Sequence, residues 1–122
     1  MNKTEALADA IALNNGSSDP INFLYFLRNP GALKAFIARH ERDDRGYRIF
    51  ESYADGYRAL INDLKVKCGG RSTFGVGPHT PLKDALFLFN IDNHTGVVNH
   101  LKKVIGEEVD EHMALGFFAD KE

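Results

Sequence analysis

Apolar residues along this chain recur mainly at intervals of three and four, the spacing of an α-helix that buries one face. The clearest example runs from Ser52 to Cys68 and ends at Gly69 and Gly70. Ser52 and Asp55 provide a start signal, because a hydroxyl accepts a first-turn N–H and a carboxylate favours the positive helix end. We expect the longest or second-longest helix here. Its predicted buried stripe is Tyr53, Tyr57, Leu60, Ile61 and Leu64.

Two helices are predicted upstream of this one. The first covers about 4–13, with Thr4 as its cap. The second covers 21–27 and follows Ser18-Asp19-Pro20, an acidic cap with proline at the first helical position. Because 21–27 is apolar nearly all round, we expect it to be deeply buried. It must break before Pro30, since proline disfavours helical geometry at the residue before it.

Three more helices are predicted downstream. Thr80-Pro81 repeats the start signal of a capping residue followed by proline, so a helix is predicted after it. A further helix is predicted over about 95–105, ending at Gly106, and 107–118 suggests a final short helix. The apolar residues expected to be buried are Leu82, Ala85, Leu86, Phe89, Val97, Val98, Leu101, Val104, Ile105, Val109, Met113 and Phe117.

The middle of the chain is less regular. Leu33, Phe36 and Ile37 fit helical spacing, which favours a helix over 32–40. The charged residues 40–46 indicate a solvated turn, and 47–50 indicate a short strand. The sequence therefore predicts a mainly α protein, a single compact helical domain (1–122) of five to six short helices with at most a small β element.

Composition excludes several classes of function. The chain has 122 residues, and its net charge of −2 provides no overall field to gather nucleic acid or an anionic membrane. Its lone cysteine, Cys68, cannot form an internal disulfide, and we expect it half-buried in a helix. No apolar run approaches the ~20 residues that span a bilayer, and the first residues lack the apolar core of a signal peptide. We expect synthesis in a cytoplasm.

Three short blocks of sequence resemble a domain of bacteriophage and prophage virion proteins that is related to lysozyme. The first is Asn29-Pro30-Gly31-Ala32-Leu33-Lys34, with Ala32 where the family often has Asn and Lys34 in place of Arg. The second block has Phe50, Ser52, Gly56, Ala59 and Leu60. The third is Asp92-Asn93-His94-Thr95, followed by a helix. The resemblance spans about 28–106 and implies a lysozyme-like fold.

The third block departs from the family pattern. Its Ala-Pro element is missing, Asp92 replaces the usual Glu, and Val97 and Val98 occupy the region of a common tyrosine. If the family pocket binds sugar, this chain has lost part of it. The resemblance therefore favours a virion-associated structural, tail or ejected protein that binds other virion proteins and is made in the bacterial host cytoplasm.

Glycan cleavage requires a carboxylic acid in apolar surroundings, together with a second carboxylate or a positioned water. Glu41 is the candidate acid, because it lies between a predicted helix and a possible β segment, where lysozyme-like folds place theirs. The alternative is an exposed loop charge whose pKa Arg42 and Arg45 would hold low.

Four further residues are candidates for substrate binding. Glu51 is alternatively a strand-end or cap residue, and Asp92 alternatively caps the helix at 95, with Asn93 beside it. Asn29 alternatively belongs to a structural turn with Pro30 and Gly31, in which proline fixes one dihedral and glycine permits a positive φ. That turn could bring Asn29 beside the helix entry at Gly56.

Other chemistry has little support in the sequence. The glycine-rich connection 69–79 matches neither a phosphate-binding loop nor a dinucleotide turn. The five histidines form no His-x-x-x-His pair, and no recognisable ligand set accompanies them, so we expect no metal and no cofactor. Two alternatives to virion binding stay open: a peptidoglycan-degrading, muramidase-like hydrolase that cleaves the glycan during phage entry, and a small phage inhibitor of a host protein.

Overall fold

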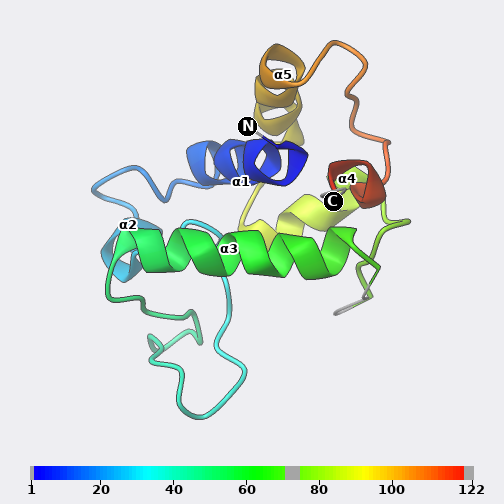
Figure 1. Cartoon of the computed structure of the whole chain (residues 1–122). Helices are drawn as coiled ribbons and strands as arrows, with labels where there is room; N and C mark the ends of the chain where they lie inside the picture. Colours follow the sequence, from blue (N-terminus) through cyan, green and yellow to red (C-terminus); the bar gives the residue numbers. More distant parts are fainter. Residues whose placement is uncertain (1, 71–74, 120–122) are drawn as a thin grey trace.

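The computed structural model describes residues 2–70 and 75–119. Five α-helices and two 3₁₀ helices, η1 and η2, lie in these ranges, and isolated β-bridges take the place of strands there. In chain order the elements are α1 (Lys3–Asn14), α2 (Phe23–Leu27), α3 (Tyr53–Cys68), α4 (Leu82–Ala85), η1 (Leu86–Phe89), α5 (His94–Val104) and η2 (Leu115–Phe118). The prediction of a mainly α domain is confirmed (Figure 1).

The core forms around α1, which contacts α3, α5 and η2. This helix is rich in small and apolar residues on most of its surface, so it can be covered from several sides (Figure 1). Asn2, not Thr4, is its N-cap and accepts a hydrogen bond from the backbone N–H of Glu5 at 2.8 Å. The buried Thr4 hydroxyl instead donates to the carbonyl of Phe118 at 2.7 Å, which ties η2 to α1.

The prediction for α3 is confirmed in its length and in the centre of its stripe. It has 16 residues, and the Ser52 hydroxyl accepts from the N–H of Asp55 at 3.1 Å. Leu60 and Leu64 are fully buried. The N-terminal end of the predicted stripe lies nearer the surface, since Tyr53 is 48% exposed, and Tyr57 and Ile61 are half-buried. The Tyr57 hydroxyl donates to Asp9 of α1 at 2.6 Å, so this stripe joins α3 to α1.

Helix α2 contradicts the expectation of deep burial. It starts at Phe23 rather than residue 21, and the Asn22 side chain, not Asp19, caps it. Only Leu24 of this helix is buried, whereas Ile21 is 88% exposed. A five-residue helix presents one side to the rest of the molecule, so an apolar sequence on every side does not bury every side.

The segment 32–40 is not a helix, contrary to the prediction. Residues 33–35 run extended beside 46–48, with the N–H of Arg48 donating to the carbonyl of Leu33 and the N–H of Ala35 donating to the carbonyl of Gly46, and 37–40 form a turn. Isolated bridges pair Lys34 with Tyr47 and Arg42 with Arg48, so the small β element is confirmed only in this reduced form. These hydrogen bonds between distant residues pair backbone N–H and C=O groups that a helix would have paired locally.

The charged turn at 40–46 is confirmed. The Asp43 carboxylate accepts from the N–H groups of Arg45 and Tyr47, at 3.0 and 2.9 Å, and closes the turn. These bonds follow from the chemistry of aspartate in turns, because its short side chain reaches the backbone two residues ahead.

The start signals in the C-terminal half are corrected. Pro81 itself is the residue before α4, and the Thr80 hydroxyl accepts from the N–H of Gly77 instead of capping the helix. Asn93, not Asp92, caps α5 through its bond from the N–H of Thr95 at 3.0 Å. The predicted connection 69–79 includes 71–74, which lie outside the described residues.

The prediction of buried residues in this half is confirmed for Leu82, Ala85, Leu86, Phe89, Val97, Val98, Leu101 and Val109. Ile105, Met113 and Phe117 are only half-buried. Val104 is 45% exposed, because α5 ends there. The segment 107–118 is helical only in η2; before it, Met113 and Glu111 accept from the N–H groups of Leu82 and Lys83. Val109 is buried without a helix around it.

Candidate functional site

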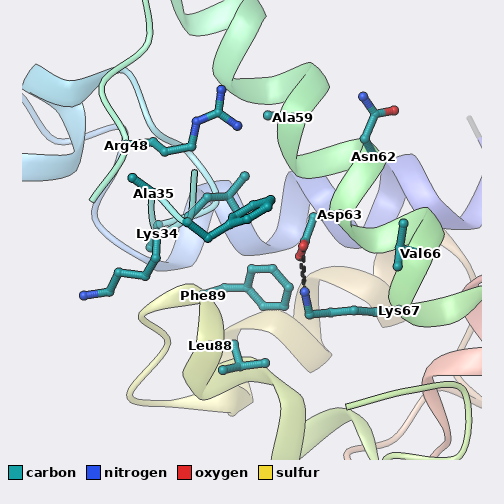
Figure 2. A pocket seen from close by; sticks show the side chains of 13 residues that line it. Lys34, Ala35, Arg48, Ala59, Asn62, Asp63, Val66, Lys67, Leu88 and Phe89 are labelled. Carbon is teal, nitrogen blue, oxygen red and sulfur yellow. Dashed lines mark hydrogen bonds and ion pairs between the residues drawn. The ribbon is translucent and has the colours of Figure 1, made fainter. Parts of the chain in front are cut away.

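A pocket of about 740 Å³ lies between the extended segment 32–36, one side of α3 and the end of η1 (Figure 2). Side chains from these three parts of the chain point into it, and most of them are apolar. The residues that line it are Ala32, Leu33, Lys34, Ala35, Phe36, Arg48, Ala59, Asn62, Asp63, Val66, Lys67, Leu88 and Phe89.

The wall formed by 32–36 is held in place by Asn29, which is fully buried. Its amide nitrogen donates to the carbonyls of Leu33 (2.9 Å) and Arg48 (3.0 Å), and its amide oxygen accepts from the N–H of Leu33 (2.9 Å). One side chain thus ties together both extended segments beside the pocket. Asn29 has no surface with which to contact a ligand, so its role is structural.

Left-handed backbone occurs on either side of Gly31 rather than at Gly31 itself. Arg28 and Ala32 both have φ of 53°. Gly31 is required for space, because a Cβ there would lie 2.8 Å from Cδ1 of Leu60. The predicted turn is therefore present, but the prediction of a positive φ at Gly31 is wrong.

Gly56 lets α3 approach this turn. A Cβ at Gly56 would overlap the carbonyl oxygen of Arg28 and lie 2.8 Å from Cδ of Pro30. We expect Gly56→Ala to lower the free energy of unfolding by about 1–3 kcal/mol, the usual cost of an overpacked site, because the obstacle is backbone. Urea unfolding followed by circular dichroism measures this change. Gly46→Ala is the contrasting variant, since φ of 90° makes it strained although no atom lies within 4 Å of its Cβ.

An ion pair lies on one side of the pocket, between residues one helical turn apart on α3. The Lys67 ammonium group donates to both carboxylate oxygens of Asp63 at 2.6 Å, and the Lys67 side chain is only 4% exposed (Figure 2). The ammonium nitrogen also lies 5.8 Å from the ring centroid of Phe89. A buried lysine needs such a partner, so the charge of Asp63 is committed to Lys67.

Arg48 brings a further cation to the pocket, besides Lys34 and Lys67. Its guanidinium extends toward α3 near Ala59 (Figure 2) and lies 4.5 Å from the ring centroid of Phe50. No carboxylate within the two described ranges forms an ion pair with it. Burial, followed by the neighbouring charge of Arg39, lowers the pKa of Arg48, yet a guanidinium stays protonated at any physiological pH.

The predicted site residues do not converge on one place. Glu41 is exposed in the 40–46 turn, and Glu51 is exposed just before α3. Asp92 and Asn93 are also exposed but lie at the start of α5, on the other side of α3 from that turn (Figure 1). Only Asn29 borders the pocket wall, from behind. No candidate acid is brought next to the pocket.

The sequence reasoning missed Asp63, Lys67 and Arg48. The spacing of Asp63 and Lys67, four residues apart on the surest helix, was a readable signal for an ion pair. Nothing in the spacing indicated that Lys67 would be buried, because that depends on Phe89 from another part of the chain.

Other kinds of site are not found in the described part of the chain. No group of three or more histidine, cysteine or acidic residues there could hold a metal ion. Cys68 is buried rather than half-buried. Across the same residues, no helix has the length and apolar character needed to cross a membrane. No protein-family model, curated protein or solved structure matches the chain.

Proposed function

We propose that this chain is a virion-associated phage protein of lysozyme-like ancestry that acts by binding another protein. The observation that carries the binding role is the pocket: its walls are mostly apolar, and its one carboxylate among the lining residues is paired with Lys67. Pockets of this size and lining take ligand side chains, whereas hydrolysis needs an acid that can give up a proton.

The virion assignment draws its support from the resemblance to phage proteins. The residues that carry its first two blocks are in contact: Asn29, Pro30 and Gly31 form the turn against which Gly56 packs. Residue 32, where the similar sequences often have Asn, is left-handed here with φ of 53°. Asn tolerates that geometry better than most residues, so the motif has a structural reason in this fold.

The rival activity, glycan cleavage, gains no support from its candidate acid, Glu41. Glu41 is exposed, and its backbone carbonyl accepts a hydrogen bond from the N–H of Ile49 at 2.9 Å. An exposed carboxylate has none of the apolar surroundings that a glycosidase acid requires. The structure thus favours binding over hydrolysis.

Two measurements test this proposal. We expect mass spectrometry of purified virions to detect the chain, and zymography on bacterial cell walls to show no clearing by the wild-type protein. Glu41→Gln serves as the active-site variant in the zymogram, with Glu107→Gln as a matched exposed control. Clearing by the wild type that Glu41→Gln abolishes and Glu107→Gln preserves would establish the hydrolase. A chain absent from virions but bound to a host protein would instead establish the inhibitor.

A further inference from the structure

We propose that the pocket recognises a segment of another protein in which an apolar side chain stands next to a carboxylate. The apolar side chain enters between segment 32–36 and α3, and the carboxylate pairs with the guanidinium of Arg48. This inference rests on the proposed binding function and specifies the chemistry of its partner.

The apolar part of the proposal follows from the walls. Leu33, Val66 and Leu88 face the pocket from the extended segment, from α3 and from η1. Phe36 stands at its edge with 74% of its surface exposed. A ligand side chain that covers the exposed Phe36 ring removes apolar surface from water, which favours binding. The pocket volume of about 740 Å³ is ample for one leucine or phenylalanine side chain.

The acidic part of the proposal follows from the charges. Asp63 is neutralised by Lys67, which leaves Arg48 and Lys34 as the lining cations without an ion pair among the described residues. The Lys34 ammonium group lies over the Tyr47 ring, 3.7 Å from its centroid, whereas the Arg48 guanidinium extends toward α3 across the pocket (Figure 2). Arg39 lies close enough to Arg48 to lower its pKa. The charges of Arg48, Arg39 and Arg42 also act together on His40, whose pKa is lowered by burial first and then by these three. Arg39 and Arg42 do not line the pocket, but their charges add to the positive field around Arg48.

The acidic residues of the 40–46 turn leave the guanidinium of Arg48 available to a ligand carboxylate. Asp43 pairs with Arg45 at 3.5 Å and accepts two backbone hydrogen bonds, so it is committed to the turn. Glu41 and Asp44 are exposed on the turn and form no ion pair with Arg48. A ligand carboxylate can bind a guanidinium through two parallel N–H···O bonds, the geometry for which arginine is best suited.

The test uses three synthetic hexapeptides. One has a Leu-Phe pair flanked by glutamates, the second replaces the glutamates by glutamines, and the third replaces Leu-Phe by Gly-Gly. Binding to the ¹⁵N-labelled protein is followed by amide chemical shifts, which locate it. We expect the first peptide to shift amides of 59–66 and to bind about tenfold more tightly than either of the others, since a charge-assisted pair is worth roughly that factor.

Variants separate the two parts of the recognition. Arg48→Gln is expected to remove the preference for glutamate over glutamine while leaving weak binding of both peptides. Arg58→Gln is the matched control, because Arg58 is exposed on α3, outside the pocket, and pairs with Asp55. Ala59→Met narrows the pocket and is expected to weaken both Leu-Phe peptides equally. Circular dichroism confirms that each variant is folded.

Several results would overturn this inference. They are equal binding of the glutamate and glutamine peptides, a preference that survives Arg48→Gln, shifts confined to amides away from the pocket, or tighter binding of a single-stranded oligonucleotide at Arg48. Presence in virions is measured separately. A chain found in virions without any glutamate preference loses only this inference, and a chain absent from virions that shows the preference loses only the virion assignment.

Discussion

Asn29→Ala is expected to lower the free energy of unfolding by about 2–5 kcal/mol. Removing the amide leaves the N–H of Leu33 and the carbonyl of Arg48 without their partner inside the protein, and each orphaned buried group costs roughly 1–3 kcal/mol. The carbonyl of Leu33 keeps its bond from the N–H of Arg48. Because segment 32–36 would lose the hydrogen bonds from Asn29, we also expect peptides to bind the pocket less tightly.

The measurement is urea unfolding, with two comparison variants. Asn99→Ala removes an exposed asparagine from α5 and should change stability little. Gly31→Val places a larger side chain against Leu60 and should destabilise about as much as Asn29→Ala. If Asn29→Ala proved as mild as Asn99→Ala, the three hydrogen bonds of Asn29 would not be what holds the wall in place.

Leu60→Ala and Leu64→Ala are each expected to cost about 2–5 kcal/mol. Both side chains are fully buried in the core cluster, so truncation removes apolar contact and leaves a cavity that a packed interior cannot fill. Leu13→Ala is the matched control, because Leu13 lies on α1 but is 59% exposed. A thermal melt that showed Leu60→Ala or Leu64→Ala to be as harmless as Leu13→Ala would mean that this face of α3 does not pack on the core.

These two experiments examine different links between sequence and structure. The Leu60 and Leu64 stripe was readable from spacing alone, since residues four apart share a helix face whatever surrounds them. The role of Asn29 was not readable in this way. Its sequence context suggested a turn, but its three partners lie at Leu33 and Arg48, and the second of these is reached only when the chain folds back.

The errors of the sequence reading have one common cause. Helical spacing in 32–40 and an apolar run at 21–27 are local properties. The conformation of the first segment and the exposure of the second depend instead on contacts with distant parts of the chain. Residues 33–35 pair with 46–48, and α2 is left at the surface with Phe26 65% exposed. Neither result can be derived from a window of neighbouring residues.

The candidate site shows the same division. Glu41 was favoured because its position along the chain suits an acid, yet the turn that contains it is exposed. The pocket instead combines Arg48, Asp63 and Phe89, which are distant in sequence and unremarkable as motifs. A pocket made from three separate parts of the chain leaves no contiguous signal.

The sequence by itself determined the helical class, the extent of α3, its Ser52 cap, and the buried faces of α4, η1 and much of α5, because periodicity and capping depend on residues within a few turns. Only the tertiary structure decided that Asn29 is a buried anchor, that Gly31 and Gly56 are needed for space, and that Lys67 and Arg48 face one pocket. These outcomes depend on contacts between distant segments, and burial, which sets the environment of each charge, exists only once those segments have met.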